Sequence, residues 1–143
     1  MVSKSLVTAK LVELADRAAR AQAHRKPSAA ELAGDRDALD LVSFNLMLAV
    51  QTCADIASHL ISDEGWPPAA TLADSFARLE AHGVITATTA KALGRAVGLR
   101  NVVAHGYSAV DPALVHAAST AGLTDLDAFA REVAVWLTSA DLR

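Results

Sequence analysis

Apolar residues recur three and four positions apart along most of the chain, the spacing that places side chains on one face of an α-helix. This pattern predicts a first helix over residues 3–24, which the Arg25-Lys26-Pro27 segment ends. Ser28 and Glu31 then have the form of a capping box for a short helical turn. Because no stretch alternates apolar and polar residues for long enough to make a strand, we expect an all-α fold.

The longest predicted helix runs over residues 35–63 and is apolar on two sides. Leu41, Phe44 and Leu48 form a second strip beside its main seam. A helix with two apolar sides needs two partners, so it lies either in the middle of a bundle or at a subunit interface. The main seam alternates three- and four-residue steps, as in a helical bundle, and consists of Leu39, Val42, Leu46, Ala49, Cys53, Ile56 and Leu60.

The same helix contains the most apolar stretch of the chain, but polar residues interrupt it. A membrane span needs about 18 or more residues with few or no charges. We therefore expect a buried helix of a soluble protein and no membrane association. The amphipathic N-terminal segment does not resemble a secretory signal, which predicts a cytoplasmic protein. The interrupting residues are Asp40, Asn45, Gln51, Asp55 and His59.

Turn-forming residues divide the second half of the chain. A rigid turn at residues 65–68 precedes a short helix over residues 71–82, with Gly83 as the residue that ends it. The next helix begins near Thr86 or Thr88 and reaches at least Asn101.

Two further helices are expected near the C-terminus. Asp111-Pro112 starts the first of them, with Asp as N-cap and Pro in the first turn. Gly122 is expected to end that helix, and Thr124 and Asp127 to cap the last one.

Composition agrees with one helical domain over residues 1–143. The chain is 52% hydrophobic but only 4% aromatic, and Ala and Leu, both strong helix formers, supply much of the apolar content. The single cysteine, Cys53, excludes an internal disulfide and a cysteine-based metal cluster. Its place in an apolar seam favours a buried structural thiol over a nucleophile.

The charge is unevenly distributed. A formal net charge of −3 argues against a general nucleic-acid coat protein. However, no Asp or Glu occurs between Glu80 and Asp111, a window that contains Lys91, Arg95 and Arg100. Solvated helix faces explain this pattern on charge alone, but a locally positive face also suits a polyanion.

Most of the five histidines have an ordinary structural interpretation. His59 follows Asp55 by four residues, so the two share a helix face and can contact each other. An isolated Asp/His pair falls short of a metal site, and we expect no metal ion and no other cofactor.

Residues 99–107 lie at the end of a helix rich in Ala, Val and Leu, and they include an arginine, an asparagine, a histidine and a tyrosine. Asn101 and His105 project from one side at about 100° per residue. Gly106 makes continuation of the helix doubtful, so His105 is expected at its C-terminus, where the helix dipole favours a protonated imidazole. Arg100 and Tyr107 share another side only if the helix continues.

Arginine and histidine together, without carboxylates, suit metal-free cleavage of RNA. An imidazole can take the proton of the ribose 2′-OH, and a guanidinium can hold the charge that develops on phosphorus. An arginine five residues before a histidine is common by chance, however, and its spacing alone favours a structural role.

The surrounding sequence resembles the HepT toxins of type VII HepT–MntA toxin–antitoxin systems, which are HEPN ribonucleases. The segment from Arg100 through His105 to Tyr107 has the R-x4-H-x-Y form of that family. Similar blocks occur in the same order between about Asp35 and Leu137. They are residues 36–38, 55–61, 76–79, 83–85, 98–101, 110–111 and 125–129.

This resemblance implies a HEPN-like up-and-down helical bundle with a short C-terminal helical extension. It implies a homodimer whose two Arg/His segments form one RNA-cleaving cleft without metal. Arg100 and His105 would be the catalytic pair and Asn101 a supporting polar residue. Tyr107 would accept AMP from a cognate MntA-like nucleotidyltransferase, the antitoxin, which neutralises the toxin.

Two other functions remain open from the sequence. The chain can be a non-catalytic HEPN domain that serves as the helical partner of a minimal nucleotidyltransferase. It can also be a purely structural interaction module, which predicts no functional cost for changes at His105.

Overall fold

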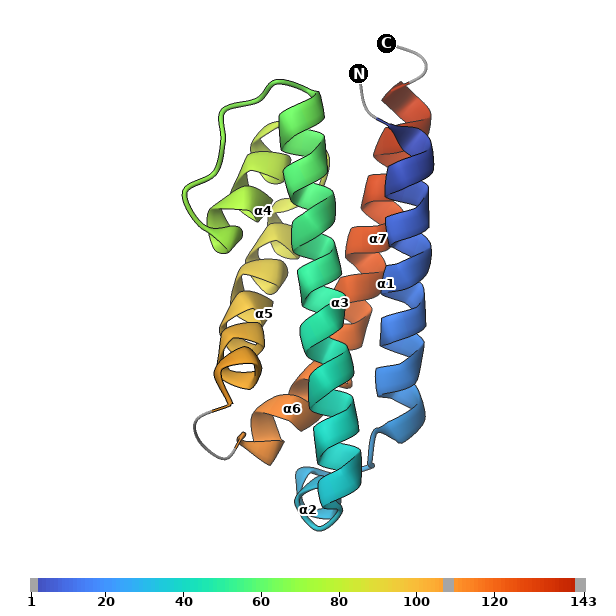
Figure 1. Cartoon of the computed structure of the whole chain (residues 1–143), viewed down its shortest axis with the longest axis vertical. Helices are drawn as coiled ribbons and strands as arrows, with labels where there is room; N and C mark the ends of the chain where they lie inside the picture. The colour runs from blue at the N-terminus through green and yellow to red at the C-terminus, as the bar shows by residue number, and fades with distance from the viewer. Residues whose placement is uncertain (1–2, 107–109, 141–143) are drawn as a thin grey trace.

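The computed structural model describes residues 3–106 and 110–140, and seven α-helices lie within these ranges (Figure 1). Four long helices run alternately up and down the molecule, and three short ones connect them at its ends. The helices are α1 (Lys4–His24), α2 (Ala29–Ala33), α3 (Arg36–Asp63), α4 (Leu72–Ala81), α5 (Ala87–His105), α6 (Pro112–Ala118) and α7 (Ala121–Ala140).

Helix α3 forms the centre of the bundle and contacts all six other helices. The long helices α1, α3, α5 and α7 also contact one another in a closed cycle, because α7 packs against both α5 and α1. This arrangement confirms the expected all-α, up-and-down bundle. It places the C-terminal end of α5 beside the N-terminal half of α3 (Figure 1).

Side-chain caps begin the helices where the sequence predicts. Ser28 Oγ accepts the backbone N–H of Glu31 at 3.1 Å and donates to its carboxylate at 3.1 Å. Asp35 accepts the N–H of Ala38 at 3.1 Å and lies 3.1 Å from the Lys26 ammonium. The backbone hydrogen bond first, and then Lys26, lowers the pKa of Asp35 below its ordinary value.

The last helix begins earlier than the sequence predicts. Helix α6 ends at Ala118, and α7 begins at Ala121, so Gly122, Thr124 and Asp127 all lie inside α7. The predicted C-terminus at Gly122 and the predicted caps at Thr124 and Asp127 are therefore wrong. Hydroxyl groups end α6 instead, because Ser119 Oγ and Thr120 Oγ1 donate to the carbonyl oxygen of His116 at 2.8 and 3.2 Å.

The main seam of α3 forms the core. Cys53 is fully buried, and burial raises the pKa of its thiol, which makes it a structural residue. Phe76 of α4 and Phe129 of α7 close the core with an edge-to-face contact, their ring centres 5.9 Å apart. The buried seam residues are Val42, Leu46, Ala49, Cys53, Ile56 and Leu60.

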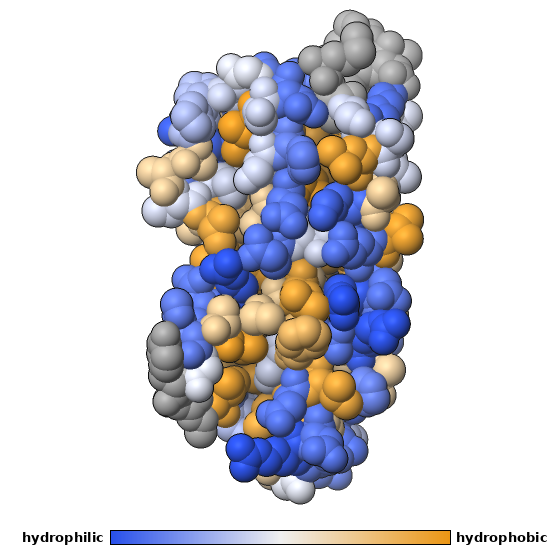
Figure 2. All heavy atoms as spheres, in the orientation of Figure 1, coloured by the Kyte–Doolittle hydropathy of each residue, from blue (hydrophilic) through white to orange (hydrophobic). Residues whose placement is uncertain are grey.

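The second apolar strip of α3 remains largely uncovered in the single chain. Leu41 is 41% exposed and Phe44 is 49% exposed, while Leu48 is half-buried. Figure 2 shows apolar side chains gathered over the lower half of the face toward the viewer, whereas the upper half of α3 is polar. The bundle covers the main seam of α3, whereas this second strip stays largely uncovered within the described chain.

Helix α3 is also the one described helix that is long and apolar enough to cross a membrane. Within the bundle, 61% of its most apolar 18-residue window is buried. Burial of this extent is typical of the core helix of a folded domain.

Candidate active site

The predicted catalytic segment lies on the last turns of α5. His105 is the final residue of the helix and is exposed. The helix ends there because Gly106 adopts a left-handed conformation with φ of 59°, and its N–H donates to the carbonyl oxygen of Val102 at 3.3 Å. The predicted C-terminal position of His105 is confirmed. The predicted modification site, Tyr107, lies outside the described residues.

Two neutral amide oxygens hold the guanidinium of Arg100. Arg100 is half-buried, and its Nη1 donates to Oδ1 of the neighbouring Asn101 at 2.8 Å. Its Nη2 donates to Oε1 of Gln51 on α3 at 2.6 Å. No ion pair joins Arg100 to a carboxylate in the described ranges. The guanidinium is therefore fixed in direction, and no carboxylate among the described residues offsets its positive charge.

A line of polar contacts continues from Arg100 across α3 to α1. Gln51 Nε2 donates to Asp55 Oδ1 at 3.2 Å, one turn further along α3. Asp55 Oδ2 lies 3.7 Å from the ammonium of Lys10 on α1, which also contacts Glu13 at 3.4 Å. Three helices thus contribute to the surroundings of one arginine.

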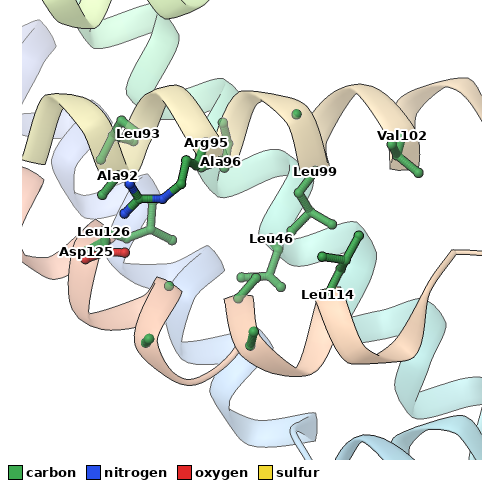
Figure 3. Close-up of a pocket in the computed structure, with 16 residues that line it drawn as sticks. Leu46, Ala92, Leu93, Arg95, Ala96, Leu99, Val102, Leu114, Asp125 and Leu126 are labelled. Atoms are coloured by element: carbon green, nitrogen blue, oxygen red, sulfur yellow. The ribbon is translucent and has the colours of Figure 1, made fainter.

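A large groove lies on a different side of α5 from Asn101, and its mainly apolar lining is unsuitable for binding RNA. Its volume is about 620 Å³, and it is lined mainly by Leu, Val, Ala and Gly residues of α3, α5, α6 and α7. Figure 3 shows Leu99 and Leu114 pointing into it, with the guanidinium of Arg95 directed toward Asp125. Asn101 is roughly 160° from Leu99 around the helix. Apolar walls do not bind phosphates, so the Arg100 face of α5 is the better candidate site.

Comparison with known proteins identifies the family. A family model described as ribonuclease HepT-like matches residues 13–133. The chain belongs to the HepT-like family. The match includes much of α1, whose sequence carries no diagnostic feature of its own. No protein of curated function matches the chain.

Solved structures share the fold of this HepT-like protein. One is a tri-AMPylated HEPN toxin of Shewanella oneidensis in complex with an MNT antitoxin. It is 23% identical, with a TM-score of 0.84 over 93% of this chain and 99% of that one. A toxin–antitoxin structure with AMP-PNP has a TM-score of 0.85 at 23% identity, over 92% of this chain and 99% of that one. At this identity the likeness establishes the HEPN-type fold.

The structure unites some predicted site residues of the HepT-like chain and adds others. Arg100 and Asn101 are hydrogen-bonded, and His105 follows Asn101 by one helical turn. The expected Asp55–His59 contact is not the one found, because Asp55 contacts Gln51 and Lys10.

No pattern in the sequence singled out Gln51 or Lys10 as a site residue. One signal was available for Gln51, a polar residue four positions before Asp55 on an otherwise apolar helix. Lys10 gave no signal for its contact with Asp55, because Asp55 lies on another helix. Among the described residues, no group of three or more His, Cys, Asp or Glu side chains could hold a metal ion.

Proposed function

We propose that this HepT-like protein is a metal-independent endoribonuclease and the toxin of a type VII toxin–antitoxin system. The observation that carries this proposal is a charged guanidinium, held by two amide oxygens, on the same helix end as an exposed imidazole. The family's description as ribonuclease HepT-like supports it. Residues 1–143 would form one such domain, acting in the cytoplasm, where its RNA substrate is found.

The proposed reaction uses the RNA itself as nucleophile. His105 removes the proton of a ribose 2′-OH, and the resulting oxygen attacks the adjacent phosphorus. Arg100 stabilises the negative charge on the phosphoryl oxygens of the transition state, with Asn101 supporting its position. The bond to the 5′ oxygen then breaks and that oxygen takes up a proton. The products are a 2′,3′-cyclic phosphate and a 5′-hydroxyl end.

RNA cleavage in EDTA tests this function directly. We expect the purified chain to cut single-stranded RNA with unchanged rate after EDTA is added, because no step uses a metal ion. Product ends are identified by mass, with the 2′,3′-cyclic phosphate expected. Cleavage that stops in EDTA and returns with Mg²⁺ would contradict the proposed chemistry. Absence of cleavage, with binding to a nucleotidyltransferase retained, would instead support a non-catalytic HEPN partner.

We further propose that two chains pair to form one composite cleft. The exposed apolar strip of Leu41 and Phe44 supports this, because an apolar surface on a helix is stabilised by a second protein surface. Each protomer would contribute one imidazole, so that one His105 can act as base and the other as acid.

Phe44→Glu should convert the dimer to a monomer and abolish cleavage with it. The introduced charge cannot be buried in an apolar interface without a large cost. The measurement is light scattering at micromolar concentration, where the native interface should bury more than about 1,000 Å². Val135→Glu is the matched control, because Val135 is 67% exposed on α7, away from the strip. A native chain that scatters as a monomer would exclude the composite cleft.

A cognate MntA-like nucleotidyltransferase completes the proposed system as antitoxin. The solved relative of the same fold is tri-AMPylated and bound to an MNT antitoxin. Tyr107 is the proposed acceptor of AMP here, because it lies two residues after His105 in the chain. AMP attached there would bring negative charge and bulk to a cleft that must admit RNA.

A further inference from the structure

We propose that Gln51 is the positioning residue of Arg100, and that its role depends on its being a neutral acceptor with a fixed amide orientation. This inference rests on the proposed ribonuclease function, and it adds residues of α3 and α1 to a site defined so far on α5. Gln51 touches no reacting atom in this proposal. It acts through the guanidinium that does.

The geometry provides two separate anchors for one guanidinium. A guanidinium is planar and has five N–H donors in a fixed arrangement. Nη1 donates to Asn101 at 2.8 Å and Nη2 donates to Gln51 at 2.6 Å. The first anchor lies on the same helix as Arg100, whereas the second joins α5 to α3. Two bonds from different nitrogens fix the plane of the group, and the contact with Gln51 fixes it relative to the core of the bundle.

The chemical type of the acceptor matters as much as its position. A carboxylate at the position of Gln51 would form an ion pair with Arg100 and compete with the phosphoryl oxygens for the same donors. An amide oxygen accepts a hydrogen bond without carrying a net charge. Gln51 therefore orients the cation while leaving its charge available to the substrate.

Asp55 determines which way the Gln51 amide faces. An amide has an oxygen that accepts and a nitrogen that donates, and rotation exchanges them. With Nε2 donating to Asp55 at 3.2 Å, Oε1 is directed to Arg100. In the opposite orientation, the Gln51 NH₂ group would face the N–H donors of Arg100. The Gln51 oxygen would then face the carboxylate oxygen of Asp55. The ammonium of Lys10 lies 3.7 Å from the other oxygen of that carboxylate.

The test compares two substitutions of Gln51 in the full-length chain. Gln51→Glu keeps an acceptor of the same shape but adds a charge. Gln51→Met has similar length and removes the acceptor. We expect each to lower the rate of RNA cleavage by about tenfold or more, less than the roughly 10² to 10³ that follows direct loss of a transition-state donor. Gln22→Glu is the matched control, because Gln22 is the chain's other glutamine and is exposed on α1.

The pH dependence separates positioning from a structural role. The rate of Gln51→Glu relative to the native chain should rise as pH falls from about 6 to about 4, because the ordinary pKa of a glutamate is about 4.3 and protonation turns the introduced carboxylate back into a neutral acceptor. The relative rate of Gln51→Met should not change with pH. A merely structural role would give both variants the same flat profile. Rates equal to those of Gln22→Glu at every pH would overturn the inference.

If the Gln51 variants lose helicity, a milder substitution at Asp55 tests the same inference. Asp55→Asn keeps the shape of its side chain but can present either a donor or an acceptor to Gln51. It should lower the rate in the same direction, by less than Gln51→Met, and an unchanged rate would then overturn the inference. A further outcome is that the native chain cleaves RNA and His105→Ala does not, while the Gln51 and Asp55 variants cleave at the native rate. That result would overturn the positioning role of Gln51 and leave the proposed function standing. Absence of cleavage by the native chain removes the proposed function itself.

Discussion

His105→Ala is expected to reduce RNA cleavage by about 10² to 10⁴-fold, the usual effect of removing an acid/base group. In cells the same substitution should relieve growth arrest. The fold should be unaffected, because His105 is exposed at the end of α5 and lies outside the packed core. The measurements are single-turnover cleavage of a labelled RNA, and the helical content and Tm of the variant by circular dichroism.

His24 offers a close control for this experiment. It is the last residue of α1, as His105 is the last residue of α5, and both are exposed. His24→Ala should cleave RNA like the native chain. Loss of toxicity in His105→Ala together with a large fall in Tm would favour the structural interpretation of the motif. Full activity of His105→Ala would exclude the proposed mechanism.

Tyr107→Phe is expected to remain an active nuclease that its antitoxin can no longer modify. In the proposed mechanism the phenol has no part in proton transfer, so cleavage should continue at about the native rate. The proposed AMP acceptor is lost, however, because Tyr107 is the only tyrosine in the sequence. A cell that makes the variant should therefore stop growing even when the nucleotidyltransferase is present.

Intact mass after incubation with the nucleotidyltransferase and ATP measures this directly. The native chain should gain mass in multiples of AMP, whereas Tyr107→Phe should gain none. Increments that persist in the variant would place the modified residue elsewhere. A catalytically inactive nucleotidyltransferase supplies the control for binding. If it rescues growth of cells that make Tyr107→Phe, neutralisation is by complex formation and the modification is not required.

Local sequence rules predicted most of the fold because helix boundaries in this protein depend on local chemistry. Asp35, Thr71 and Asp111 each accept a backbone N–H of the following turn, and each was recognisable as a cap or boundary. The boundary before α7 was misplaced because Gly122 resembles a helix terminator in sequence. In the fold it lies within α7, where an added Cβ would meet the Ala118 side chain at 3.3 Å.

The candidate active site depends on contacts between helices, so the sequence predicted only the part that lies on one helix. Arg100, Asn101 and His105 were visible because they lie together in the sequence. Gln51 lies 49 residues from Arg100, and only the packing of α3 against α5 brings the two side chains together. A pairing of this kind has no local signal, and a polar residue on a core helix can have many partners. The residues around a motif can therefore be found only after the helices are placed.

Gly106 divides the motif of this HepT-like protein into two parts with different freedom to vary. Arg100 and His105 both lie in α5, so one residue inserted between them would rotate the imidazole by about 100° around the helix axis. The helix ends at His105, and Gly106 adopts the left-handed conformation. A change of length after this glycine would leave Arg100 and His105 in place and alter only the length of chain between His105 and the proposed acceptor, Tyr107. The proposed nuclease activity and its proposed control by modification therefore depend on separate parts of the motif, and either can be altered by a change of length without the other.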